Sequence, residues 1–148
     1  MDVSSILRRK GTHVEAARPH TTVAEAADRM SKSRIGSLVV CDRNGHLLGI
    51  LSERDIVCAL DAHGRASFDL PIGDVLRATT ATCRPSDSAR EVMSMMTRHR
   101  ARHLPVMEED VLIGIISIGD VVKGQLEELE LEVGVLRDYV RTRPVRPR

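Results

Sequence analysis

The chain carries one residue pattern twice, and this duplication is the strongest constraint on its fold. Residues 47–57 read LLGILSERDIV and residues 112–122 read LIGIISIGDVV, while Arg18-Pro19 returns as Arg84-Pro85. A duplicated unit usually stacks on its twin, because neither copy alone buries its apolar face. The pattern therefore predicts two similar halves that share a core, with a shared cleft as one consequence.

Composition and charge place the chain among ordinary soluble proteins. Its 148 residues, 42% hydrophobic and 29% charged, suit one compact domain or two small units with a common core. The net charge is only +1, and aromatic residues for base stacking make up 1%. No apolar run reaches the roughly 18 residues of a membrane span, and MDVSSILRRKG lacks the apolar stretch of a secretion signal. We therefore expect a cytoplasmic protein with neither membrane nor nucleic acid as its partner.

The cysteines do not form a recognisable disulfide or metal pattern. Cys41, Cys58 and Cys83 are odd in number and show no CxxC spacing. The histidines are scattered without metal-ligand spacing. We expect three buried thiols in a reducing cytosol and no metal site.

Each copy has the residue pattern of a β-α-β-β-α unit. In the first copy, a short apolar segment at 13–17 precedes a helix that starts after Thr22, where TVAE fits a capping box. Two strands are predicted at 37–42 and 46–52, and a second helix follows Ser52. The second copy places the same elements at 79–83, after Ser88, at 103–107, at 111–117 and after Ser117. The predicted fold class is α/β (α+β), with two such units packed together.

The repeats also divide the chain into predicted segments. Short helical stretches at 4–9 and 72–77 precede the two copies. In chain order we expect a first repeat with its N-terminal helix at 1–63, a polar linker at 64–71, a second repeat at 72–128, an extension of the last helix at 129–140, and a disordered basic tail at 141–148.

The last predicted helix continues past the second repeat with a heptad-like apolar seam. Its members follow one another at intervals of 4, 3, 4, 3 and 4: Val122, Leu126, Leu129, Val133, Leu136 and Val140. The seam packs either on its own domain or on a partner. Because the repeat covers only the first half of this helix, a partner is favoured, most simply a second copy in a homodimer.

These patterns resemble the cystathionine-β-synthase (CBS) domain family. A tandem β-α-β-β-α unit with G-[IV]-hydrophobic-S-x-x-D closing its second strand is typical of a CBS pair, or Bateman module. The sequence RHLPV at 102–106, followed by GIISIGD at 114–120, is typical of stand-alone bacterial members. The resemblance covers residues 3–128 and implies two repeats packed sheet to sheet about a pseudo-twofold axis. It also implies two clefts for adenosyl ligands: AMP, ADP, ATP or NAD(H), with S-adenosylmethionine less expected.

The Ser-x-x-Asp motif of the first copy has a structural and a functional interpretation, and the two are compatible. Ser52 can cap the following helix, and Asp55 at the third position suits the positive end of the helix dipole. Free amides at a helix start also bind anions, and Arg54 adds a forked donor for phosphate. The resemblance implies that Asp55 binds the ribose hydroxyls while Ser52 and Arg54 approach the phosphate.

The second copy keeps this motif as Ser117 and Asp120 but lacks the adjacent cation, because Ile118-Gly119 replaces the Glu-Arg pair of the first copy. Its phosphate would need Arg102, His103 or a residue from across the cleft. The two sites should therefore differ, and they hold either different nucleotides or only one.

Further candidate contacts lie around these motifs. Lys10, which has no counterpart before the second copy, is a phosphate contact or, alternatively, a solvated lysine at a helix end. Gly36-Ser37 precedes the first core strand, where the resemblance implies contacts to base and phosphate, and Gly36 allows close approach. With few aromatics, adenine would lie among aliphatic side chains such as Val14, Ile35 and Ile50, with Ile115 equivalent to Ile50 in the second copy.

These residues favour a regulatory module without catalysis. No Ser-His-Asp arrangement, paired-carboxylate motif or P-loop stands out in the sequence. We expect an adenine-nucleotide sensor that signals energy or redox state to an effector protein, which the sequence does not identify. The alternative is a protein-interaction or dimerisation module without a nucleotide ligand. Neutral charge and missing aromatics disfavour nucleic-acid binding through the arginines of the tail.

Overall fold

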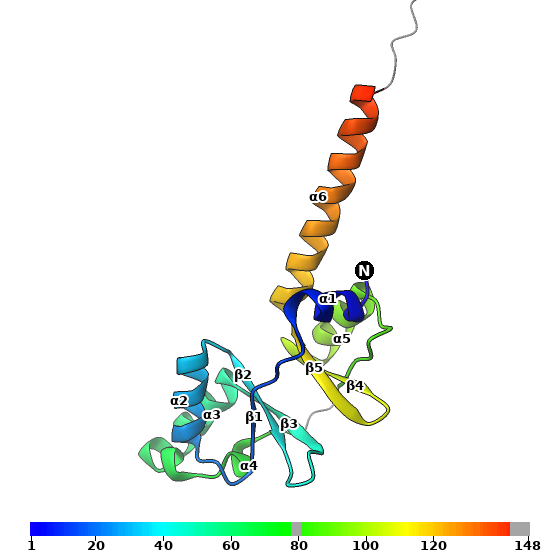
Figure 1. Cartoon of the computed structure of the whole chain (residues 1–148). Helices are drawn as coiled ribbons and strands as arrows, with labels where there is room; N and C mark the ends of the chain where they lie inside the picture. Colours follow the sequence, from blue (N-terminus) through cyan, green and yellow to red (C-terminus); the bar gives the residue numbers. More distant parts are fainter. Residues whose placement is uncertain (78–80, 143–148) are drawn as a thin grey trace, which may run out of the picture.

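The computed structural model describes residues 1–77 and 81–142 and contains two similar units (Figure 1). The first consists of β1 (Ala16–Ala17), α2 (Val23–Ser33), β2 (Ser37–Cys41), β3 (Leu47–Ser52) and α3 (Glu53–His63). The second consists of α5 (Ala89–His99), β4 (His103–Glu108), β5 (Val111–Ser117) and α6 (Ile118–Thr142). Outside these units lie α1 (Val3–Lys10), the 3-10 helix η1 (Gly64–Asp69) and α4 (Ile72–Val75). The predicted α/β (α+β) class is confirmed, while the strand predicted at 79–83 lies partly outside the described residues.

The first helix of each repeat begins and ends in the same way. Thr22 and Ser88 each accept a hydrogen bond from the amide three residues later, and the glutamate at that position accepts one from the cap backbone. Both predicted capping boxes are therefore confirmed. Both helices end at an arginine in the left-handed conformation, Arg34 at φ 53° and Arg100 at φ 50°.

The strands of the two repeats also pair in the same way. β2 is antiparallel to β3 and parallel to β1, and β4 is antiparallel to β5. Cys83 forms a parallel bridge with Val106, in the place that β1 occupies beside β2. Each hairpin has an irregular register at the equivalent position, between Val40 and Cys41 and between Val106 and Met107. The duplication in sequence thus extends to details of the backbone.

Each of the short helices α1 and α4 packs on the repeat that does not directly follow it in the chain. Helix α1 precedes the first repeat but packs on the second, and α4 precedes the second repeat but packs on the first. Val3 and Leu7 of α1 are buried in one apolar cluster with Ile116 and other residues of the second repeat. Ile72 of α4 is buried with Leu51 in the cluster of the first repeat. Figure 1 shows α1 beside α5 and the first turns of α6, and α4 beside the first repeat. The chain therefore crosses between the two units twice, which ties them together.

The segment predicted as a linker, 64–71, has a defined structure. Residues of η1 pack against α3 and α2, and Ser67 is buried. The amide of Val23 donates to the carbonyl of Leu70, and the amide of Ile72 donates to the carbonyl of Thr21. These bonds fix the entry to α4 against the start of α2.

Helix α6 extends well past the second repeat. Its 25 residues span about 37 Å at 1.5 Å per residue. Figure 1 shows it leaving the second repeat on the side away from the first. The predicted disordered tail lies outside the described residues from 143 onward, and Arg141 and Thr142 are still helical. Among the described residues, no helix is both long enough and apolar enough to cross a membrane.

The cysteines differ in exposure, which corrects part of the prediction for them. Cys41 and Cys83 are buried, but Cys58 is exposed. Cys58 lies on the outer side of α3, whereas the buried residues of that helix are Asp55 and Ala59. Burial raises the pKa of the Cys83 thiol to about 12. The prediction of three buried thiols was therefore wrong for Cys58.

Candidate functional site

One face of each sheet is covered by helices, and the other is left for the opposite repeat. Leu38, Val40 and Leu51 belong to the apolar cluster that includes residues of α2 and α4. Because successive residues of a strand point to opposite faces, Val39 and Ile50 lie on the other face. Val39 is only 1% exposed although it belongs to neither apolar cluster. Its burial points to cover from the second repeat.

The strand residues predicted for the site all lie on this second face. They are Ser37, Ile50 and Ser52 in the first repeat and His103, Ile115 and Ser117 in the second. The two sets approach each other, because a Cβ atom built on Gly36 would lie 3.7 Å from Cε1 of His103 and 3.7 Å from Cδ of Glu53. The structure thus brings the start of β2 and the start of β4, which are equivalent in the two repeats, close together. Glu53 was not among the predicted site residues.

The start of helix α3 fixes the carboxylate of Asp55. The amide of Ser52 donates to Oδ2 of Asp55 at 2.8 Å, and Oγ of Ser52 lies 3.0 Å from the same oxygen. The amide of Asp55 donates in return to Oγ of Ser52 at 3.2 Å, so the predicted helix cap is confirmed. The Asp55 side chain is largely buried, and its Oδ1 lies 3.8 Å from Nε of Arg77. Oδ2 of Asp55 is therefore bonded within the helix cap, while Oδ1 faces the guanidinium group of Arg77.

Asp120 is held in the same way at the start of α6 but has a closer cation. The amide of Ser117 donates to Oδ2 of Asp120 at 2.8 Å, and the amide of Asp120 donates to Oγ of Ser117 at 3.1 Å. Nζ of Lys10 donates to the same Oδ2 at 2.6 Å and to the carbonyl of Ile115 at 3.0 Å. Burial raises the pKa of Asp120, but the hydrogen bonds from Lys10 and Ser117 outweigh it, so the pKa lies below the ordinary aspartate value.

The position of Lys10 corrects the interpretation based on its place in the sequence. Lys10 precedes the first repeat, yet its ammonium group binds the carboxylate of the second, because α1 packs there. It supplies the cation that the second motif lacks locally. Arg77, which follows α4, occupies the matching position against Asp55, so Lys10 does have a counterpart. Sequence reasoning missed Arg77; the one available signal was that both cations follow a short helix preceding a repeat.

His103 lies half-buried between groups of both charges. Burial and the nearby Lys10 lower its pKa, while Asp120 and Glu53 raise it by less. The net pKa lies below the ordinary histidine value, so the imidazole is neutral at pH 7. A neutral ring can both donate and accept a hydrogen bond at this point between the repeats.

The other residues predicted for the site are not all gathered around the two aspartates. Arg54 and Arg102 are exposed, and Val14 is half-buried. Ile35 packs against the core of the first repeat and, with Gly36, lines a hollow of about 580 Å³ between α2 and α3. This hollow lies on the helical side of the repeat. The geometry therefore does not bring Ile35 onto the strand face that carries Ile50.

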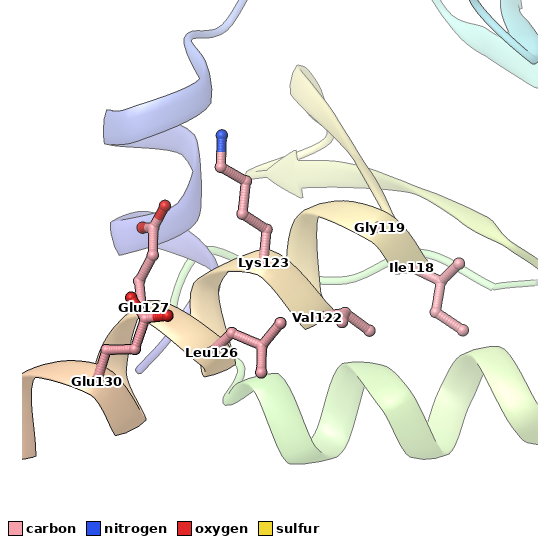
Figure 2. Close-up of a pocket in the computed structure, with 7 residues that line it drawn as sticks. All are labelled: Ile118, Gly119, Val122, Lys123, Leu126, Glu127 and Glu130. Carbon is pink, nitrogen blue, oxygen red and sulfur yellow. The ribbon is translucent and has the colours of Figure 1, made fainter. Parts of the chain in front are cut away.

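A second hollow, of about 570 Å³, lies on the helical side of the second repeat. It is lined by residues of α6, which Figure 2 shows as sticks: Ile118, Gly119, Val122, Lys123, Leu126, Glu127 and Glu130. In Figure 2 the apolar side chains extend to one side of the helix and Lys123 and Glu127 to another. The hollow of the second repeat is thus formed by one face of α6, whereas the hollow of the first repeat also includes Gly36 and Glu53, which lie close to His103.

The groups gathered between the sheets are suited to binding. Carboxylates accept hydrogen bonds from hydroxyl groups, and Lys10 and Arg77, beside the positive ends of two helices, attract anions. Most amides at these helix starts already donate hydrogen bonds within the fold, namely those of Ser52, Glu53, Asp55, Ser117, Ile118 and Asp120. Within residues 1–77 and 81–142, no three or more His, Cys, Asp or Glu side chains are grouped so that they could hold a metal ion.

Comparison with known proteins agrees with this architecture. The sequence profile of the CBS domain matches the chain twice, at residues 3–62 and 72–127. The CBS domain-containing protein YhcV of Bacillus subtilis is 30% identical over 124 residues, which cover 84% of this chain and 87% of YhcV. The crystal structure of the CBS-domain containing protein ATU1752 from Agrobacterium tumefaciens has a TM-score of 0.82 at 38% identity, covering 84% of this chain and 99% of that one.

A further similar structure contains a ligand. CBSX2 in complex with AMP has a TM-score of 0.70 at 26% identity, covering 85% of this chain and 96% of CBSX2. The twofold profile match, the shared fold and the two equivalent Ser-x-x-Asp helix starts all lead to one assignment. The chain belongs to the CBS-domain family and is a tandem pair of CBS domains, a regulatory module.

Proposed function

We propose that this CBS pair is a non-catalytic cytoplasmic sensor that binds an adenosyl nucleotide (AMP, ADP, ATP or NAD(H)) between its repeats. The observation that carries the proposal is that two carboxylates lie at equivalent helix starts, each with Oδ2 held by a serine amide at 2.8 Å. Oδ1 of each aspartate has two lone pairs, which suit the two hydroxyls of a ribose. The AMP complex of the similar protein CBSX2 supports this ligand class.

The phosphate groups of the ligand would meet different cations in the two clefts. Arg54 and Arg77 serve the first cleft, and Lys10 and Arg102 serve the second. In the second cleft, Lys10 is already paired with Oδ2 of Asp120, so its ammonium group must leave that oxygen before it can bind a phosphate. We therefore propose that the first cleft binds more tightly, and that occupation of the second moves α1.

The proposed output is a change of helix or dimer geometry that an effector protein detects. Support comes from the position of both aspartates on the first turns of α3 and α6, whose outer faces carry exposed apolar residues. Val57 is 63% exposed and Val122 is 48% exposed at equivalent positions of these helices. A ligand that shifts either helix start therefore acts directly on a surface available to a partner.

The test is a thermal-shift panel with AMP, ADP, ATP, NAD+, NADH and S-adenosylmethionine. A nucleotide at 100 times its Kd should add about 2.7 kcal/mol of stability. Asp55→Ala should remove the shift from the first cleft, and Asp120→Ala that from the second. Glu25→Ala and Glu91→Ala are matched controls, because they delete the same capping-box position from α2 and α5, away from the cleft. The controls should lose basal stability yet keep the ligand shift.

The absence of a shift with every nucleotide would overturn the sensor function. Equal loss of the shift in the two controls and the two cleft variants would also contradict it, because the aspartates would then act only as helix caps. The second candidate is a dimerisation module without a nucleotide, favoured by the exposed valines on equivalent helix faces. Light scattering with and without nucleotide distinguishes the two, since a pure dimerisation module keeps its mass and stability in both conditions.

A further inference from the structure

The C-terminal half of α6 has no cover from the rest of the described chain. Ion pairs join the middle of α6 to the N-terminal segment: Arg9 of α1 pairs with Glu127, and the ammonium group of Met1 pairs with Glu128. Beyond Glu128, large apolar side chains are strongly exposed, with Leu136 at 63% and Val140 at 71%. Isolated helices of this length are marginal in water, and burial of an apolar face normally stabilises them. This half of α6 therefore needs a partner surface.

The exposed residues are organised along the helix. One stripe runs the whole length at heptad spacing and consists of Val122, Leu126, Leu129, Val133, Leu136 and Val140. Its first residues line the hollow shown in Figure 2, so the stripe is continuous from the second repeat to the end of α6. Leu131 and Val135 lie on the opposite side, continuing the face that α1 covers lower down, and they are outside the stripe.

We propose that this stripe is the seam of a parallel two-stranded coiled coil with α6 of a second copy of this chain. In heptad notation, position a holds Leu126, Val133 and Val140, and position d holds Val122, Leu129 and Leu136. Four of these six positions follow the pattern of valine at a and leucine at d, and Leu126 and Val122 depart from it. This pattern favours parallel dimers over higher oligomers, because β-branched and γ-branched side chains pack differently in the two layers. This inference does not depend on the nucleotide function.

The charges beside the seam select the parallel orientation. In a parallel pair, a residue at position g of one helix lies beside the position e residue of the other helix whose number is five higher. Glu132 of each copy therefore lies beside Arg137 of the other copy, which gives two such pairs in the dimer. A fully overlapping antiparallel pair would instead set Glu130 against Glu130 and Glu132 against Glu132. An antiparallel pair shifted by one heptad could match Glu130 with Arg137 but would leave Val122 and Leu126 uncovered.

The first test is cysteine cross-linking in a Cys58→Ser background, which removes the exposed native thiol. Parallel helices in register bring the two copies of residue 140 together, so Val140→Cys should give a disulfide-linked dimer under mild oxidation. Leu131→Cys is the matched control, because residue 131 is similarly exposed at 66% but lies on the opposite side of the helix. Equal cross-linking of the two variants, or none in either, would overturn the proposal.

The second test identifies the orientation by exchange of charges, with sedimentation equilibrium as the measurement. Glu132→Lys or Arg137→Glu alone should raise the dimer Kd about tenfold, as expected when two exposed ion pairs become repulsions. Combining the two changes should restore the original Kd. Arg141→Glu is the control for altered charge near the helix end and should change the Kd little. Rescue of Arg137→Glu by Glu130→Lys, and not by Glu132→Lys, would refute the parallel arrangement.

Discussion

Nζ of Lys10 lies 2.6 Å from Oδ2 of Asp120, so the helix before the first CBS domain provides the cation for the second. Arg77 makes the corresponding but looser approach to Asp55, at 3.8 Å. Each acidic residue thus meets a cation from a segment that crosses between the domains. A ligand that competes for Asp120 would therefore act on α1, and one that competes for Asp55 would act on the segment after α4.

Replacing Lys10 tests this ion pair through its pH dependence. Lys10→Met should destabilise the protein by about 0.5–1 kcal/mol at pH 7, the size of a partly exposed pair. The folded-state pKa of Asp120 lies below its ordinary value of 3.8, so the stabilisation is fully present above that pH and is lost as the pH falls through the lower pKa. Urea unfolding at pH 7 and pH 3 should show a difference between wild type and variant that shrinks at pH 3.

Lys32→Met provides the matched control for that experiment. Lys32 pairs with Asp28 on the exposed side of α2, where both side chains are mostly in solvent. Lys32→Met should lower the free energy of unfolding by at most about 0.5 kcal/mol. A loss for Lys10→Met that is the same at both pH values would show that its methylene packing, and not its charge, matters.

His103 should make stability fall as the pH drops below 7. Its pKa is lower in the folded protein than the ordinary value of 6.5, so the unfolded chain binds more protons between these two pKa values. The free energy of unfolding therefore rises with pH in this window. The contribution of His103 is lost as the pH falls through 6.5 toward the folded-state pKa. His103→Gln should remove this component, as measured by unfolding at pH 7.5 and 5.5. His20→Gln, an exposed control, should keep the wild-type slope; the same slope in His103→Gln would contradict the assignment.

The features predicted correctly from the sequence are those encoded by near neighbours. Thr22 and Ser88 identify helix starts because the capping box needs only residues three apart. The duplicated strand and helix order follows from the same local patterns. The serine–aspartate geometry at Ser52 and Asp55 was also within reach, because it is a bond between residues three apart.

The features that could not be predicted depend on long-range packing. Lys10 and Asp120 are 110 residues apart, and nothing in the local pattern says that α1 lies on the second domain. Cys58 has apolar neighbours in sequence, yet the helix face that carries it points to solvent. The approach of Gly36 to His103 likewise depends on how the two sheets meet.

The equivalent glycines of β3 and β5 should differ in their tolerance of a methyl group. A Cβ atom on Gly49 would lie 2.9 Å from the backbone carbonyl oxygen of Arg77, which the chain cannot easily move. On Gly114 it would lie 2.8 Å from Cδ2 of Leu7, the end of a side chain that can rotate. Gly49→Ala should therefore cost about 1–3 kcal/mol, the range for overpacking, and Gly114→Ala should cost less. Urea unfolding of the two variants measures this, and a larger loss for Gly114→Ala would contradict the argument.

The three thiols should separate into one reactive and two protected groups. Cys58 is exposed on α3, whereas burial raises the pKa of Cys41 and raises that of Cys83 to about 12. The thiolate is the nucleophile, so buried thiols with raised pKa react slowly. A chromogenic disulfide reagent at pH 8 should modify one thiol per chain rapidly and the other two only in denaturant. Cys58→Ser should abolish the rapid phase without lowering stability, and a rapid phase that survives this substitution would show that one of the other cysteines is accessible in solution.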